Sequence, residues 1–311
     1  MSSTGAGYDY SPTVYSPDGR MYQAEYASKA VENAGTSVGI RCKDGVVLAT
    51  EKIVLSKMLC KTSNRRLFSC DLSTGKSRHQ QQPWLVDRQP WWCFFVKDGS
   101  PDVAFPHPLL PLCLLPSPPS PPPGLACSGF APDGRQLVNQ ARDMCSSYKE
   151  QYGVTIPPNQ LADRLSQYVH AHTCYHYLRP FGSACLMAGY DEDTKKHELY
   201  SVQADGLMYR MIGAAIGKGA RGAQTEIERG HFEEKTCAEC LVDIAKIIST
   251  IHDDVKDKPY VLEMSWITEA TGFKHCMVDD AVVQAARVDA ETAIKAEEEE
   301  SDDDDDDDDD E

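Results

Sequence analysis

The chain has 311 residues, with 31 Lys and Arg against 48 Asp and Glu, which gives a formal net charge of −17. Fourteen of the acidic residues lie within residues 297–311, so the rest of the chain carries only −3. We expect no membrane or nucleic-acid partner, because no apolar run reaches the roughly 18 residues of a membrane-spanning helix and the near-neutral body has no stripe of Lys and Arg. The N-terminus does not resemble a secretory signal, so the twelve Cys are expected to be reduced.

The spacing of apolar residues predicts an α/β (α+β) domain. After a turn at Ser16-Pro17-Asp18-Gly19 it predicts a helix at 21–33, strands at 36–42 and 46–51 joined by an Asp44-Gly45 hairpin turn, and strands at 66–70 and 126–130. It then predicts helices at 133–152 and 159–177, strands at 183–190, 197–203 and 207–211, helices at 218–229 and 237–254, a strand at 261–267 and a helix at 279–298. Paired helices between antiparallel strands indicate a layered sandwich and not a doubly wound parallel sheet.

Residues 76–124 have an unusual composition, with twelve of the nineteen Pro and three of the four Trp. A structureless loop of this length inside a domain is uncommon. We interpret the segment as an insertion, and as retained intron sequence: its Leu/Pro/Ser run is what a translated pyrimidine tract looks like. Gly75-Lys76-Ser77 and Pro123-Gly124 can be encoded with a splice donor and a splice acceptor. The alternative is a genuine polyproline ligand for aromatic grooves.

Two groups of residues have metal-binding side chains. Cys237-Ala-Glu-Cys240 has no second pair at zinc spacing, so helix packing is the favoured interpretation over a metal or redox role. The segment His170-Ala-His-Thr-Cys-Tyr-His176 contains two i,i+4 pairs on different helix faces, without a carboxylate nearby in sequence. We therefore expect no metal and no cofactor.

Several motifs together resemble a known family. They are Tyr8-Asp9, Tyr15-Ser-Pro-Asp-Gly-Arg20, Gln23-Ala-Glu-Tyr-Ala27, Gly35-Thr-Ser-Val-Gly-Ile40, Asp44-Gly-Val-Val-Leu-Ala49, Arg179-Pro-Phe-Gly182 and Ala215-Ile-Gly-Lys218. The chain resembles the alpha-type subunits of the 20S proteasome core over nearly all of its length outside 76–124.

The resemblance implies a four-layer αββα sandwich of two antiparallel sheets, of the N-terminal-nucleophile hydrolase type. Residues 1–20 would form an N-terminal gate segment, 21–296 the domain, and 297–311 a disordered acidic tail. The implied partners are other proteasome alpha subunits as ring neighbours, the beta subunits, and the regulatory particle or other activators. The implied role is a seven-membered outer ring that gates substrate entry for ubiquitin-dependent protein degradation, in the cytoplasm and nucleus.

The resemblance also implies that this chain is not catalytic. Aligning the hairpin on Gly45-Val-Val47 places the nucleophilic Thr of the beta subunits at Gly35, which has no side chain to react. Their catalytic Asp falls at Glu51. Their Lys falls at or next to Arg66, which cannot act as a neutral amine.

Family gate residues correspond to Tyr8, Asp9, Pro17 and Tyr26, whose cluster would hold the open gate. Without the resemblance, Pro17 would be only a turn residue and Tyr26 only a helix residue facing the core. Many alpha subunits have Arg after Tyr-Asp, where this chain has Tyr10, so that salt bridge is not available here.

Activator tails end in a carboxylate, which a Lys of the family binds in pockets between neighbouring subunits. That position falls at Arg66, and Arg can hold a carboxylate through two donors. The alternative is a solvated charge pair of Arg65 and Arg66 at the start of a strand.

The acidic tail contains one serine, Ser301, followed by Asp residues. We expect the tail to contact basic surfaces, or Ser301 to be phosphorylated, as alternatives to a role in solubility alone. The competing hypothesis for the whole chain is an assembly-incompetent splice form, or a free acidic-tailed protein that binds basic partners.

Overall fold

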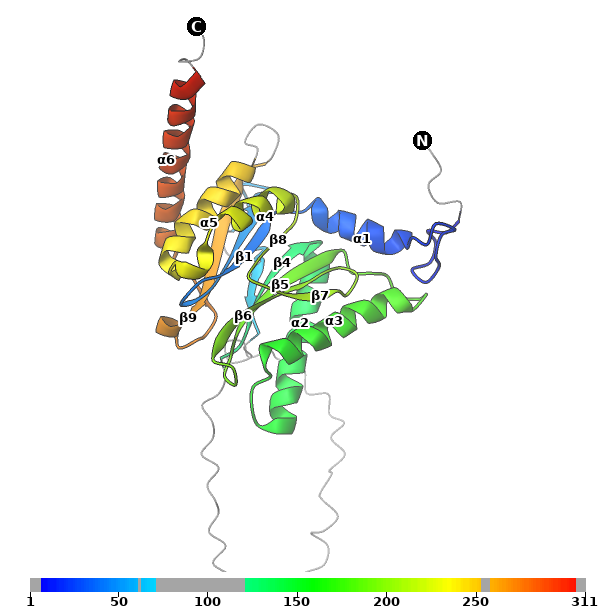
Figure 1. The fold of residues 1–311 in the computed structure, drawn as a ribbon. Helices are drawn as coiled ribbons and strands as arrows, with labels where there is room; N and C mark the ends of the chain where they lie inside the picture. The colour runs from blue at the N-terminus through cyan, green and yellow to red at the C-terminus, as the bar shows by residue number, and fades with distance from the viewer. Residues whose placement is uncertain (1–6, 61–62, 71–120, 253–257, 306–311) are drawn as a thin grey trace, which may run out of the picture. The chain divides into compact units, whose positions relative to one another are not determined.

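Two antiparallel sheets of five strands stack face to face at the centre of the molecule (Figure 1). The computed structural model describes the chain apart from residues 1–6, 61–62, 71–120, 253–257 and 306–311. Sheet A has the order β10-β9-β2-β1-β8, with β10 Cys276–Met277, β9 Tyr260–Thr268, β2 Gly45–Ile53, β1 Ser37–Arg41 and β8 Gly213–Ile216. Sheet B has the order β3-β4-β5-β6-β7, with β3 Leu67–Ser69, β4 Gly124–Gly129, β5 Ser183–Asp191, β6 Lys196–Val202 and β7 Met208–Met211.

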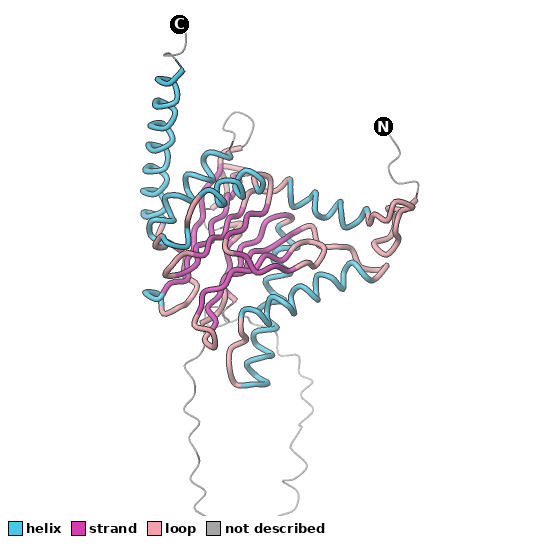
Figure 2. Tube along the Cα trace, in the orientation of Figure 1, coloured by secondary structure: helices cyan, strands magenta, loops and turns pink. Residues whose placement is uncertain are grey.

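Helices cover the outer face of each sheet, as the tube in Figure 2 shows. On sheet B lie α2 (Ala131–Tyr152) and α3 (Pro158–Cys174), and on sheet A lie α4 (Ala220–Arg229), α5 (Cys237–Ile251) and α6 (Asp280–Asp305). The helix α1 (Tyr22–Glu32) packs against β4 and β5, and two short 3-10 turns lie at Phe232–Glu234 and Glu269–Thr271. The predicted four-layer αββα sandwich is confirmed.

Three hydrophobic cores separate the four layers. Strand β2 shows why, because its alternate side chains enter two of them. Val46 and Leu48 face the core between the sheets, together with Leu186 of β5. Val47 lies in the core under α5, with Ile244. A strand buried on both faces needs apolar residues at nearly every position, which explains the unbroken apolar run at the start of β2.

Two strands were not predicted. Strand β8 pairs with β1 in the register Ser37↔Ile216, although its sequence Gly-Ala-Ala-Ile has little β propensity. Small residues are required here because a Cβ at Gly213 would lie 2.4 Å from the Ile227 side chain. The second strand, β10, is only two residues long.

The ends of three helices differ from the prediction, and one of them is α5, which stops at Ile251 and not at 254. The helix α3 stops at Cys174, three residues before the predicted end at 177, because Tyr175 takes an extended conformation. The helix α6 continues to Asp305, into the segment expected to be disordered from residue 297. Four consecutive Glu residues extend it, since Glu is a good helix former. Residues 306–311 lie outside the described part of the chain.

The C-terminal end of the predicted insertion is paired with the domain in the structure. Gly124 belongs to β4, where it pairs with Ser69 and Ala188, and the Pro123 carbonyl accepts a hydrogen bond of 3.0 Å from the Cys70 amide. Residues 121–124 are therefore part of the domain. The earlier part of the segment, up to residue 120, lies outside the described residues. Glycine fits at 124 because a Cβ there would lie 2.0 Å from the imidazole of His275.

The imidazole of His275 predicts a loss of stability in acid. Its Nε2 atom is buried without a hydrogen-bond partner, and burial lowers the pKa of His275 to about 4. The folded state thus binds this proton less readily than the unfolded state does. The contribution of the neutral ring to the free energy of unfolding is fully present above about pH 6.5. This free energy falls by up to about 3 kcal/mol as the pH drops toward 4.

We expect His275→Gln to reduce this acid-dependent loss, as measured by urea denaturation of the full chain between pH 7 and 4. The matched control is His176→Gln, because His176 lies on the surface. Parallel curves of unfolding free energy against pH for the wild type and His275→Gln would contradict the prediction.

Candidate functional site

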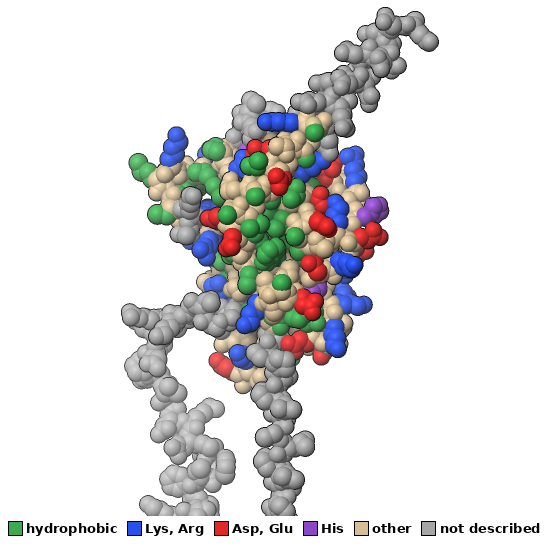
Figure 3. Space-filling model, turned by 90° about the vertical axis from the view of Figure 1, so that its left-hand side faces the viewer, with side chains coloured by type: hydrophobic (Ala, Val, Ile, Leu, Met, Phe, Trp, Pro, Cys, Tyr) green, Lys and Arg blue, Asp and Glu red, His purple; other side chains and the backbone are tan. Residues whose placement is uncertain are grey.

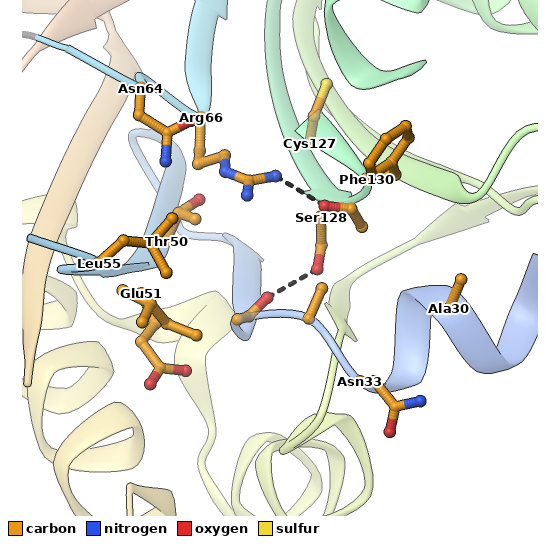
Figure 4. A pocket seen from close by; sticks show the side chains of 14 residues that line it. Ala30, Asn33, Thr50, Glu51, Leu55, Asn64, Arg66, Cys127, Ser128 and Phe130 are labelled. Carbon is orange, nitrogen blue, oxygen red and sulfur yellow. Dashed lines mark hydrogen bonds between the residues drawn. The ribbon is translucent and has the colours of Figure 1, made fainter. Parts of the chain in front are cut away.

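A cavity of about 300 Å³ lies where the end of α1, the β1–β2 hairpin and β4 meet (Figure 4). It brings together Gly35, Glu51 and Arg66, the three residues that the hairpin alignment predicts at catalytic positions of the beta subunits. Gly35 precedes β1, Glu51 lies in β2, and Arg66 directly precedes β3, so both sheets contribute. The complete lining is Ala30, Asn33, Ala34, Gly35, Thr50, Glu51, Ile53, Leu55, Asn64, Arg66, Cys127, Ser128, Gly129 and Phe130.

The backbone at Gly35 is enclosed by its neighbours. Its carbonyl accepts a hydrogen bond of 2.6 Å from the Ser128 hydroxyl, drawn as a dashed line in Figure 4. A Cβ at Gly35 would lie 2.5 Å from the carbonyl oxygen of Glu51, so no side chain fits without a shift of the backbone. The next residue, Thr36, is also held, because its hydroxyl accepts a hydrogen bond of 3.1 Å from the Gly219 amide.

Both carboxylate oxygens of Glu51 take part in structural contacts. Oε2 accepts a hydrogen bond of 3.0 Å from the Thr36 amide, and Oε1 lies 2.8 Å from Nδ1 of His252. The His252 side chain is only 2% exposed, and its ring lies 4.3 Å from that of Tyr260. Figure 4 shows the carboxylate directed away from Arg66. Glu51 therefore ties β2 to the start of β1 and to the end of α5.

Arg66 brings positive charge to the cavity wall. Its Nη1 donates a hydrogen bond of 2.9 Å to the Gly129 carbonyl, and its backbone amide donates one of 3.3 Å to Glu263. Burial lowers the pKa of the Arg66 guanidinium, which nevertheless stays protonated. Gly129 is the only hydrogen-bond acceptor of this side chain within the described residues, and a guanidinium has five N–H donors. The geometry suits a further anionic acceptor.

The predicted turn in the N-terminal segment is confirmed. The Gly19 amide donates a hydrogen bond of 2.9 Å to the Ser16 carbonyl, and the Arg20 amide donates one of 3.0 Å to the Ser16 hydroxyl. Gly19 has a φ of +74°, which glycine adopts without strain. Arg20 then forms two hydrogen bonds, of 2.7 and 2.6 Å, with the Glu25 carboxylate, which fixes the turn to the first helix.

The four predicted gate residues lie in the N-terminal segment and in α1. Tyr8 and Tyr26 are 38% and 45% exposed, and Pro17 is exposed as well. The backbone carbonyl of Asp9 accepts a hydrogen bond from the Gln23 side chain. Within the described residues, no hydrogen bond joins the side chains of Tyr8, Asp9 and Tyr26. The gate cluster stays a prediction, and these side chains are available to a neighbouring protein of a complex.

Three further predictions concern a metal site, a membrane-spanning helix and Ser301. No group of three or more His, Cys, Asp or Glu side chains among the described residues is arranged to hold a metal ion. Within the same part of the chain, no helix is long and apolar enough to cross a membrane. Ser301 lies in α6, but its side chain is outside the described set, so its phosphorylation stays a prediction.

Comparison with known proteins shows the family to which this chain belongs. Residues 8–30 match the N-terminal signature of A-type proteasome subunits, and residues 31–76 and 121–267 match the proteasome subunit family. The chain belongs to the proteasome subunit family. Residues 77–120 lie between the two matched segments and outside the match.

Relatives in this family are similar along almost their whole length. The proteasome alpha type-3 subunit of Spinacia oleracea is 41% identical over 95% of this chain and 98% of the relative. The alpha type-3 subunit of Drosophila melanogaster is 31% identical over 96% and 98%. A probable alpha type-7 subunit of Schizosaccharomyces pombe is 36% identical over 96% and 97%. The Ile40-Arg-Cys-Lys-Asp-Gly45 run and the acidic tail resemble those of type-3 alpha subunits. This resemblance agrees with the presence of type-3 subunits among the relatives.

Two residues of the site in this proteasome subunit were not predicted. Ser128 and His252 contact the Gly35 carbonyl and the Glu51 carboxylate across 93 and 201 positions of sequence. Neither residue stands in a local pattern that indicates a site. A polar residue at the end of a strand and a His after a helix are ordinary features, so only the tertiary structure reveals their role.

The space around Gly35 yields a prediction about stability. We expect Gly35→Ala to lower the free energy of unfolding by about 1–3 kcal/mol, because the added Cβ meets a backbone oxygen that cannot move alone. Chemical denaturation of the full chain measures the effect. Gly222→Ala is the matched control, since its Cβ would meet the Ile251 side chain at an ordinary 3.4 Å. Equal stability of the two variants would contradict the argument.

Proposed function

We propose that this chain is a non-catalytic alpha subunit of the 20S proteasome core that helps to form the outer seven-membered ring. The observation that carries the proposal is the A-type signature over residues 8–30, followed by the family domain. Alpha-type subunits form the non-catalytic rings of a threonine protease complex. Relatives that match over 95% of the chain are named as such subunits.

The lack of catalysis is attributed to Gly35. The hairpin alignment puts the nucleophile of the beta subunits at this residue, which offers no hydroxyl or thiol. The crowding by the Glu51 carbonyl supports the proposal, because it leaves no room for a nucleophilic side chain. The Glu51 carboxylate, for its part, contacts an amide and an imidazole instead of a reacting group.

Assembly with neighbouring subunits is supported by the surface. Met58 is 96% exposed in the loop that follows β2, and Leu55 and Leu59 beside it are exposed too. Figure 3 looks onto the side that carries α6 and β9 in Figure 1, and apolar side chains gather near its centre with charged groups around them. Exposed apolar surface of this kind is typical of faces that become buried in a complex.

The remaining parts of the proposal concern regulation. The ring neighbours are other alpha subunits, the inner neighbours are beta subunits, and the regulatory particle or other activators dock on the outer surface. Tyr8, Asp9, Pro17 and Tyr26 hold the open gate, in contacts made between subunits. The complex serves ubiquitin-dependent degradation in the cytoplasm and nucleus. The predicted insertion at 76–124 is retained intron sequence, and in the spliced chain Gly75 would directly precede Leu125.

Native mass spectrometry tests the proposal against the alternative of a free acidic-tailed protein or an assembly-incompetent splice form. We expect the chain in a complex many times heavier than its own 34.4 kDa. A chain lighter by the predicted insertion in that complex supports both the function and the intron. A full-length chain in the complex supports the function and contradicts the intron. A full-length chain found only as a monomer or an aggregate overturns the function for this form.

The Arg66 pocket gives a second test. We expect Arg66→Gln to weaken binding of an activator-derived peptide with a free C-terminal carboxylate by about tenfold or more, because a charge-assisted hydrogen bond is lost. Fluorescence anisotropy with assembled core particles measures the affinity. Arg65→Gln is the matched control, as Arg65 is exposed and does not line the cavity. The pocket assignment is wrong if an amidated peptide binds as well as the free acid, or if both variants lose affinity equally.

A further inference from the structure

A second cavity, of about 380 Å³, lies between the N-terminal segment and the last turn of α3. The two segments approach each other at one side of the ribbon in Figure 1. The cavity is separate from the Gly35 site and shares no residue with it. Its lining is Thr13, Tyr15, Met21, Ala24, His170, Thr173, Cys174 and Asp205. A volume near the lower end of the usual range of about 300–1,000 Å³ suits a small molecule.

A thiol and an imidazole face each other in this cavity. Cys174 Sγ lies 3.3 Å from Nε2 of His170, one turn earlier on the same helix. The other ring nitrogen of His170 lies 3.4 Å from the hydroxyl of Thr173. A nucleophile next to a base whose ring is oriented by a third group is the arrangement that activates a thiol.

Cys174 differs from most other thiols of the chain by its exposure. Ten free Cys lie within the described residues, of which seven are buried, Cys276 is intermediate, and only Cys60 and Cys174 are exposed. Burial raises the pKa of Cys127 to about 12 and that of Cys185 well above its usual range, which keeps these two thiols protonated and unreactive. Within the described residues, Cys60 has no imidazole in hydrogen-bond contact. It is therefore an internal reference for an exposed thiol without a base.

The charge of the cavity comes from Asp205, in the turn between β6 and β7. This turn packs on α3 because Gly206 has no side chain: a Cβ there would lie 2.7 Å from the Cβ of His170. The Ser166 hydroxyl fixes the turn by a hydrogen bond of 2.6 Å to the Gly206 carbonyl. Among the described residues of the lining, Asp205 is the only acidic or basic one besides His170, so the cavity favours a cationic molecule.

We propose that Cys174 is a covalent modification site for small cationic disulfides, with His170 as the base. His170 takes the thiol proton as Sγ attacks one sulfur of the disulfide. The new Sγ–S bond forms as the S–S bond of the small molecule breaks, and the leaving thiolate takes up the proton and departs as a thiol. The Cys174 sulfur is oxidised to the disulfide level as the departing sulfur is reduced to the thiol level, so the exchange needs no outside oxidant. This reactivity is a property of the chain's own fold and does not rest on the proposed function.

The test measures the modification rates of Cys174 and Cys60 side by side in the full-length chain. Cystamine is the cationic disulfide and 3,3′-dithiodipropionate is the anionic one, and quenched samples are digested and analysed by peptide mass spectrometry. We expect cystamine to modify Cys174 faster than Cys60, and the ratio of cystamine to dithiodipropionate rates to be larger at Cys174. The adduct on the Cys174 peptide should be absent in Cys174→Ser, which would show that Cys174 carries it.

Two variants separate the contributions of the base and of the charge. We expect His170→Gln to slow the reaction of Cys174 by about tenfold or more, since a positioned general base typically contributes a factor of this size. Asp205→Asn keeps an oxygen that can accept the 2.9 Å hydrogen bond from the Leu207 amide, so the turn should stay in place. We expect this variant to lower the ratio of cystamine to dithiodipropionate rates at Cys174 to the ratio at Cys60. The rate at Cys60 in each variant shows that the chain is still intact.

Three outcomes would overturn the proposal. One is equal rates at Cys174 and Cys60 with cystamine. Another is an unchanged rate at Cys174 in His170→Gln. The third is a charge preference that survives in Asp205→Asn while the Cys60 rate stays at its wild-type value.

Discussion

The side chains of β2 alternate between two cores, and this double burial constrains most of the structure. Val46 and Leu48 pack between the sheets, while Val47 and Ala49 pack under α5. A shift of one residue in the pairing of β2 with β1 or β9 would exchange these two sets of side chains. The register of sheet A is therefore strongly specified. Because Ser37 pairs with Thr50 and the Glu51 amide donates to the Thr36 carbonyl, the same register determines which groups meet at the cavity.

The cavity illustrates how a site can be retained while its chemistry is absent. Its walls come from both sheets, and it keeps a polar hydroxyl at Ser128 and a guanidinium at Arg66. The Glu51 carboxylate contributes to structure: it accepts a hydrogen bond from the Thr36 amide and contacts the imidazole of His252. Removing the His252 side chain would deprive the buried Glu51 Oε1 of this contact, and losing a buried polar contact costs more than losing an exposed one. The position thus supports the fold.

The hairpin, the long helices and the layered architecture could be predicted because their signals are local. The Asp44-Gly45 turn between β-forming runs sets β1 and β2, and helix α5 shows a continuous apolar face. Strand β8 could not be predicted, because its small residues are selected by the contact of Gly213 with Ile227. Gly35, Glu51 and Arg66 were found through their family positions, which preserve spacing along the chain. Ser128 and His252 were not, since their contacts depend on elements brought together only by folding.

The place of the anomalous segment explains why the sandwich tolerates it. Residues 71–120 connect β3 to β4, and the ends of these strands are already neighbours, with Ser69 paired to Gly124. The cost of closing a loop between fixed ends grows only logarithmically with its length, so each doubling adds about 0.6 kcal/mol. We therefore expect the segment to affect the surface of the chain and its contacts with neighbouring subunits more than the fold. In a ring-forming protein, this makes assembly the property that decides whether this form of the chain functions.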